Sequence, residues 1–123
     1  MKMILVPALL VLLAALAQPA AAIVHQRTLA VPEVGTLRYG ILVPDDYDPR
    51  RPRPLVLALH PGEFAPYYGA RFMMAIVSPG LDDLHAIIVA PDCPSRDWAN
   101  PIAERAVMAL LQSVLAEYTV DRH

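Results

Sequence analysis

The stretch LVLALHPGE, residues 55–63, decides the expected fold of this 123-residue chain. Its first five residues are apolar without a break, whereas a strand with one exposed face would alternate apolar and polar residues. An unbroken apolar run is typical of a strand in a parallel sheet, where both faces are buried. His60, Pro61 and Gly62 then end the run in a loop. We therefore predict a central parallel strand over residues 55–59.

A second buried strand is predicted further along the chain. Residues 85–90 read HAIIVA and lead into a polar loop over residues 91–98. Between the two strands, residues 66–77 combine Tyr, Phe, Met and Ile side chains, which predicts a helix with a broad apolar face. The Ser-Pro-Gly sequence at residues 78–80 should end this helix. Together these segments predict a strand–helix–strand unit.

A longer helix should follow the polar loop. Asn100 is a typical N-cap, Pro101 suits the first helical position, and Glu104 stands near the positive end of the helix. The helix should run to Tyr118. Apolar residues at helical spacing should form its buried face: Ala103, Val107, Leu110, Leu111, Val114 and Tyr118.

The residues before the first apolar run predict a hairpin. Residues 27–34 and 37–43 are short apolar-rich segments joined around Gly35. Residues 44–54, PDDYDPRRPRP, carry too many prolines and aspartates for a regular element and should form a loop. The predicted order is hairpin, strand, helix, strand, helix.

This order predicts an α/β fold. An antiparallel hairpin is followed by a parallel β-α-β-α part, and strands that alternate with helices indicate a mainly parallel sheet. A right-handed crossover after the last helix should deliver another central strand, which the sequence does not contain. We therefore expect residues 23–123 to be the N-terminal part of one larger domain.

Residues 1–22 are typical of a secretory signal peptide. Lys2 supplies a positive start, residues 4–17 are apolar except for Pro7, and three alanines at positions 20–22 suit signal peptidase. The apolar run is shorter than the roughly 20 residues of a membrane span. We expect a secreted or periplasmic protein with no stable membrane anchor after cleavage. An uncleaved N-terminal anchor is the alternative.

Composition excludes several function classes. The formal net charge is −2 and Lys2 is the only lysine, so nothing indicates a nucleic-acid partner. Cys93 is the only cysteine, so an internal disulfide is impossible and its fate stays open. The four histidines show no spacing typical of a metal site, and we expect neither metal nor cofactor.

Three stretches together carry a resemblance to a known family. They are YGILVPDDYDP at residues 39–49, RPLVLALH at residues 53–60 and IIVAPD at residues 87–92. With them, residues 37–123 resemble the N-terminal half of exported esterases of the α/β-hydrolase fold. The similar groups are polyhydroxybutyrate depolymerases, feruloyl esterases and dienelactone-hydrolase-like enzymes. The resemblance implies a fold truncated before the strand that carries the nucleophile.

The resemblance also implies a reaction, namely acyl transfer by a Ser-His-Asp triad whose serine stands in a G-x-S-x-G turn. No such motif occurs here, so the serine, the acid and the catalytic histidine are expected beyond residue 123. No catalytic residue is assigned within this chain, and the chain alone should be inactive. The substrate would be a small-molecule or polymeric ester.

Within this chain, the resemblance assigns the loop after residue 59 to the oxyanion hole. Backbone N–H groups of Gly62 and Glu63 are the candidate donors, and His60 would hold the loop by hydrogen bonds. The family usually has glycines here, but Pro61 has no N–H and Glu63 adds a negative charge. A plain turn that ends the strand is the alternative.

Asp92, Ser95 and Trp98 are candidates for lining a substrate cleft. They follow the second buried strand, and ligands of open α/β sheets bind at the carboxyl ends of the strands. The alternative for these residues is a capped connection into the next helix.

The function predicted from the sequence is therefore a fragment of a secreted serine hydrolase that acts on carboxylic esters. One alternative is a non-enzymatic exported module on a hydrolase-like scaffold, because fold does not fix function. Another is a fragment of a serine peptidase of the prolyl-oligopeptidase type. A third is a chain that is complete at residue 123 and barely folds.

Overall fold

The computed structural model describes residues 22–62 and 65–123. The signal peptide predicted at residues 1–22 lies outside the described residues except for Ala22. Within the described ranges, no helix combines the length and the apolar character needed to cross a membrane.

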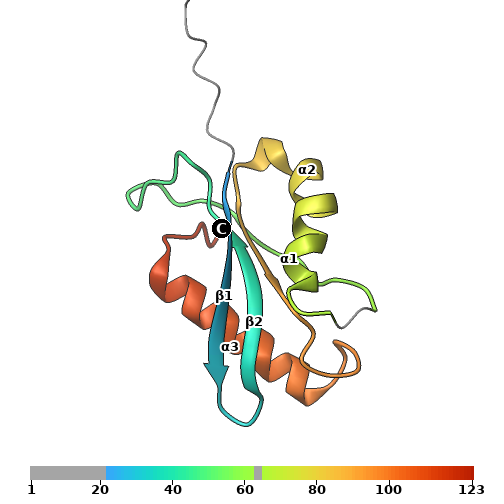
Figure 1. Cartoon of the computed structure of the whole chain (residues 1–123). Coiled ribbons are helices and arrows are strands. Elements are labelled where there is room, and N and C mark those ends of the chain that lie inside the picture. The colour runs from blue at the N-terminus through green and yellow to red at the C-terminus, as the bar shows by residue number, and fades with distance from the viewer. Residues whose placement is uncertain (1–21, 63–64) are drawn as a thin grey trace, which may run out of the picture.

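The chain begins with the expected antiparallel hairpin, formed by β1 (Val24–Val31) and β2 (Gly35–Leu42) (Figure 1). The predicted boundaries are wrong by two or three residues at three of the four strand ends. Val34, which was expected in the first strand, lies in the turn and donates its N–H to the carbonyl of Val31. The turn needs left-handed backbone at Glu33 (φ 66) and at Gly35 (φ 106), so it occupies residues 32–34 and lies earlier in the chain than the apolar pattern indicates.

The sheet has four strands in the order β1-β2-β4-β3. β3 (Leu55–Leu57) pairs in parallel with β4 (Ile87–Pro91), and β4 pairs antiparallel with β2. β3 is shorter than predicted and only half-buried, because within the described residues β4 is the one strand that flanks it. The expectation of a strand buried on both faces is therefore met by β4 and not by β3.

The predicted helix over residues 66–77 begins later and ends later than expected. It consists of α1 (Tyr68–Phe72), the π-helical turn η1 (Met73–Val77) and α2 (Ser78–Gly80). The Ser-Pro-Gly sequence does not end the helix but forms its last turn, because proline is tolerated in the first turn of a helical segment.

The connection into β4 also differs from the sequence prediction. The short 3₁₀ helix η2 (Asp82–Leu84) leads to His85, whose backbone is left-handed (φ 48). This conformation is incompatible with a strand, so β4 begins at Ile87 and not at His85.

The last helix, α3 (Pro101–Glu117), follows the prediction closely. The Asn100 side-chain oxygen accepts hydrogen bonds from the backbone N–H groups of Ile102 and Ala103, as expected of an N-cap. The backbone of Tyr118 is already extended, so the helix ends one residue before the predicted end.

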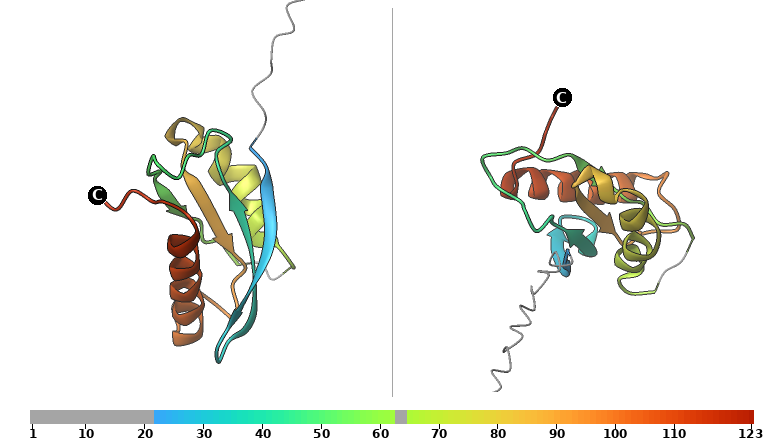
Figure 2. Two further views of the ribbon diagram at one scale, coloured as in Figure 1. Left: turned by 90° about the vertical axis from the view of Figure 1, so that its left-hand side faces the viewer. Right: turned by 90° about the horizontal axis from the view of Figure 1, so that it is seen from above.

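Helices cover both faces of the sheet, as Figure 2 shows. On one face, Leu37, Ile41, Ile87 and Val89 pack with Leu110 of α3. On the other face, Leu42, Ile88 and Ala90 pack with Met73, which lies in η1. Because alternate residues of β4 enter different cores, one short strand holds the two layers together.

The chain leaves α3 beside the free edge of β3. Val120 forms a parallel bridge with Arg53, whose N–H donates to the carbonyl of Thr119 (3.2 Å) and whose carbonyl accepts from the N–H of Asp121 (2.8 Å). The loop before β3 braces this exit, because the Tyr47 hydroxyl accepts from the N–H of Thr119 (2.9 Å). Residues 119–121 therefore run parallel to the direction of β3, alongside the residues that lead into it.

Candidate functional site

Two loops meet at the carboxyl edge of the sheet. β3 and β4 are parallel, with Leu57 opposite Val89, and the N–H of Ala58 continues the pairing with the carbonyl of Val89 (2.9 Å). The loop after β3 therefore begins next to the loop after β4 (Figure 1). This geometry brings His60 together with Asp92, Cys93 and Trp98.

His60 is buried, with 2% of its surface exposed, and both ring nitrogens have partners. Its Nε2 accepts a hydrogen bond from the N–H of Cys93 (3.0 Å), so the ring is neutral and carries its proton on Nδ1. That nitrogen donates to the carbonyl of Pro61 (3.1 Å). With both nitrogens engaged, His60 has no free atom for proton transfer to a substrate.

Two aromatic side chains enclose the His60 ring. Tyr68 and Trp98 both meet it edge-on, with ring centroids 5.0 Å and 5.5 Å away. Trp98 also donates its Nε1–H to the carbonyl of His60 (2.9 Å). His60, in the loop after β3, therefore contacts both the loop after β4 and the helix α1.

Asp92 is also buried, with 8% of its surface exposed, and its carboxylate points at the start of α1. Its Oδ2 accepts from the N–H of Tyr67 (2.6 Å), and its Oδ1 accepts from the N–H of Gly69 (3.0 Å). Arg38 supplies a cation through its Nε (3.4 Å). The Asp92 side chain is therefore occupied by α1 and Arg38.

Gly62 is exposed and has a positive φ of 34°, and a Cβ added to it would meet nothing within 4 Å. Glu63, the other oxyanion candidate, lies outside the described residues. The assignment of these two residues as oxyanion donors stays a prediction.

Ser95 and Trp98 have different surroundings. The Ser95 hydroxyl accepts from the side-chain NH₂ of Asn100, and its single hydrogen has the Asp97 carbonyl (3.0 Å) and the Asn100 Oδ1 (3.1 Å) as alternative acceptors, so Ser95 belongs to the turn that enters α3. Trp98 borders an open hollow of about 410 Å³ between the end of β3 and the start of α3. Of the three candidates for cleft lining, Trp98 alone borders this hollow. The hollow is lined by Leu59, Trp98, Ala99, Asn100, Pro101, Ala103, Glu104 and Val107.

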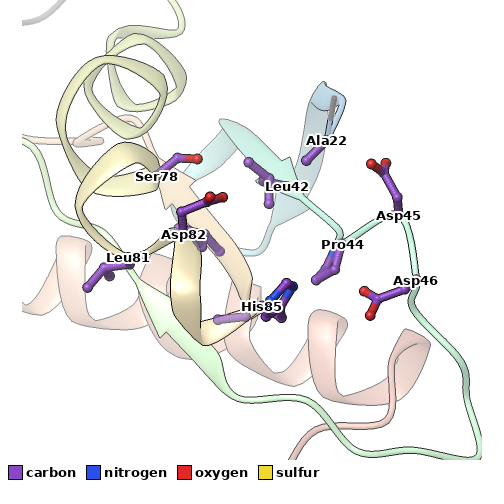
Figure 3. A pocket seen from close by; sticks show the side chains of 11 residues that line it. Ala22, Leu42, Pro44, Asp45, Asp46, Ser78, Leu81, Asp82 and His85 are labelled. Atoms are coloured by element: carbon purple, nitrogen blue, oxygen red, sulfur yellow. The ribbon is translucent and has the colours of Figure 1, made fainter. Parts of the chain in front are cut away.

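A larger cavity of about 520 Å³ lies at the opposite end of the sheet (Figure 3). Asp45 and Asp46 face Ser78, Asp82 and His85 across it. This is the end at which β3 and β4 begin, whereas His60 and Asp92 lie where they finish. We therefore place the candidate site at the carboxyl edge of the sheet, where His60 and Asp92 lie and where Trp98 borders the smaller hollow. Among the described residues, no group of three His, Cys, Asp or Glu side chains could hold a metal ion.

Sequence reasoning missed three residues of this site. Arg38 pairs with Asp92 across the β2–β4 register, Tyr68 covers the His60 ring, and Gly69 allows α1 to contact β4. A Cβ on Gly69 would lie 2.5 Å from the carbonyl oxygen of Pro91. Only Gly69 had a signal in the sequence: a glycine inside a predicted helix is disfavoured unless close packing requires it, so its presence indicates close packing.

No family model and no curated protein matches the sequence. Among solved structures, a thermostable esterase matches with a TM-score of 0.63 and 25% identity, over 80% of this chain and 32% of the esterase. An uncharacterised protein from Capnocytophaga ochracea matches with a TM-score of 0.64 and 16% identity, over 81% of this chain and 31% of that protein. A CE1 ferulic acid esterase from Anaeromyces mucronatus, solved in complex with ferulic acid, matches with a TM-score of 0.59 and 15% identity, over 81% of this chain and 44% of the esterase.

The chain spans about a third of the first two of these proteins and less than half of the third. Its mixed four-stranded sheet with helices is the fold of part of an α/β-hydrolase esterase. The resemblance to esterases and the fold class expected from the sequence are thereby confirmed.

Proposed function

We propose that this chain is the N-terminal part of a secreted serine hydrolase that cleaves carboxylic esters by acyl transfer. The observation that carries the proposal is the match of 80% of the chain to one part of a thermostable esterase. The signal-like residues 1–22 support export, and the pairing of the two loops at the carboxyl edge of the sheet supports a site there.

The exit from α3 supports a further strand beside β3. Val120 already pairs with Arg53 in parallel, on the side of β3 that faces away from β4. A strand that continued this pairing would finish at the same edge of the sheet as β3. In α/β-hydrolases the nucleophilic serine stands on a turn between a strand and a helix at this edge. The proposed serine would therefore follow residue 123 and lie near the loop that contains His60.

Each part of the proposed machinery has one role. A serine is a poor nucleophile until a histidine takes its proton, and an acid orients that histidine. We assign none of the three to this chain, because it has no G-x-S-x-G motif and because His60 has both nitrogens engaged. This chain would supply the oxyanion donor, the backbone N–H of Gly62, and Trp98 would line the cleft.

The proposal is tested with two products of the same gene, residues 23–123 alone and the same chain with its in-frame continuation. We expect the longer product to hydrolyse a simple aryl ester and the shorter product to be inactive. Replacement of the serine in the expected G-x-S-x-G turn by alanine should abolish turnover. Hydrolysis by residues 23–123 alone would contradict the proposal, because no nucleophile is assigned there.

The same experiment separates the alternatives. A continuation whose turn lacks the serine would favour a non-enzymatic exported module. Cleavage of proline-containing peptides in place of esters would favour a peptidase of the prolyl-oligopeptidase type. A stop codon directly after His123 would leave a chain that cannot be this enzyme by itself.

A further inference from the structure

The connection between β3 and α1 is fixed at both of its ends by two consecutive residues, Asp92 and Cys93. At the end near β3, the Cys93 N–H holds the ring of His60 (3.0 Å). At the end near α1, the Asp92 carboxylate holds the N–H groups of Tyr67 (2.6 Å) and Gly69 (3.0 Å). Because Asp92 and Cys93 follow directly on β4, these bonds tie the connection to the sheet.

The Asp92 bonds depend on a carboxylate. Both of its oxygens accept hydrogen bonds, and an ionised carboxyl group accepts at both oxygens without offering a donor. An asparagine in the same place would present an NH₂ group to one of the two backbone donors, and that donor would lose its partner. Arg38 supplies the neighbouring positive charge that a buried carboxylate requires.

The backbone at Tyr67 explains why such a tie is needed. Tyr67 has a positive φ of 57°, a conformation that a non-glycine residue adopts only at a cost. The short bond from its N–H to Asp92 stabilises this conformation at the point where the connection turns into α1. Without Asp92, we expect this end of the connection to take up other positions.

We propose that Asp92 is a positioning residue for the ester hydrolysis proposed above, on which this inference rests. The Asp92 bonds to Tyr67 and Gly69 hold Tyr68 between them, and the Tyr68 ring contacts the His60 ring (centroids 5.0 Å apart). His60, which Cys93 also holds, lies two residues before Gly62, so Asp92 keeps the Gly62 N–H in place through Tyr68 and His60. An oxyanion donor acts on the charge that develops in the transition state, so its placement affects kcat more than substrate binding.

The test compares Asp92→Asn with wild type in the longer, active gene product. We expect kcat and kcat/KM to fall together by about 10- to 100-fold, as expected for a displaced catalytic group, with KM nearly unchanged. Hydrogen–deuterium exchange of the segment from Tyr67 to Gly69 should become faster, while exchange in β1 and β2 stays as in wild type. Asp92→Glu, which keeps the charge, should recover part of kcat.

Two control variants separate positioning from general destabilisation. Val114→Ala removes buried methyl groups of α3 that lie in the other core, so it should lower the melting temperature without lowering kcat of the folded enzyme. Asp83→Asn changes an exposed carboxyl group in η2 and should leave kcat, KM and the melting temperature unchanged.

The outcomes distinguish the two proposals. An inactive wild-type product would overturn the proposed function, and this inference with it. An active wild type with unchanged kcat in Asp92→Asn would overturn the inference alone, and so would a loss that Val114→Ala reproduces at equal stability. If Asp92→Asn does not fold, Arg38→Gln replaces it: a lower kcat at constant KM supports the inference, and an unchanged kcat overturns it.

Discussion

At the scale of single residues, Gly69 is the point where a helix lies directly on a strand. A Cβ at this position would stand 2.5 Å from the carbonyl oxygen of Pro91 and 2.8 Å from that of Ala90. Both atoms belong to the backbone of β4, which has neighbours on both sides and cannot move away easily.

We therefore predict that Gly69→Ala lowers the free energy of unfolding by about 1–3 kcal/mol, the usual cost of overpacking a core. Urea denaturation followed by circular dichroism measures this change. Gly80→Ala is the matched control, because a Cβ there would meet nothing within 4 Å and the residue lies at the end of α2. Equal stability of the two variants would contradict the packing argument.

At the scale of elements, α3 depends on its N-cap for its first turn. The Asn100 side-chain oxygen accepts from two backbone N–H groups of the helix, while its nitrogen donates to Ser95 and Asp97. We predict that Asn100→Ala costs about 1 kcal/mol of stability, a typical value for the loss of a cap, as measured by urea denaturation. Asn100→Asp keeps the accepting oxygen and places a negative charge at the positive end of the helix, so it should lose less. A larger loss in Asn100→Asp than in Asn100→Ala would mean that the bonds to the preceding loop matter more than the cap.

The helices and strands could be predicted where they depend on residues that are close together in the sequence. The hairpin, the cap of α3 and the order of strands and helices follow from apolar periodicity and turn residues, which involve neighbours along the chain. The start of β4 could not be predicted, because it depends on the left-handed backbone of His85. The π-helical turn could not be predicted either, because the apolar pattern of residues 73–77 does not distinguish it from a regular helix.

The candidate site was predicted only as a set of residues. His60, Asp92 and Trp98 stood out because they follow predicted strands. Their bonds could not be predicted, because Asp92 reaches back to Tyr67 and Gly69, and Cys93 reaches back to His60. Contacts over such separations arise from strand pairing, which one sequence does not reveal.

At the scale of the whole molecule, one ion pair joins the loop after β2 to the strand β3 and the exit of α3. Arg53 binds Asp46 (2.7 Å) with its side chain and pairs with the chain around Val120 through its backbone. The hydrogen bond from Arg53 lowers the pKa of Asp46 below its ordinary value, although burial acts in the opposite direction. The charged form of Asp46 is thus favoured in the folded protein.

The lowered pKa of Asp46 determines how the stability of the fold should change with pH. A carboxyl group whose pKa is lowered on folding contributes stability above its unfolded pKa of about 3.9, and the contribution is lost as the pH falls through its folded pKa. We predict that wild type loses stability below about pH 4 and that Asp46→Asn loses less over the same range. Urea midpoints between pH 2 and pH 6 measure the difference, with Asp45→Asn as the control. Equal slopes for wild type and Asp46→Asn would contradict the role of this pair.

The π-helical turn Met73–Val77 has a consequence for how the gene can change. Its Ser78 N–H bonds to the carbonyl five residues back, so the turn holds one residue more than a regular α-helical turn. A deletion of one codon here would restore a regular helix but rotate everything after it by about 100°. Ser78 and Asp82 would then rotate away from the cavity that they line, so the loss of one residue from this turn would require that cavity to rearrange.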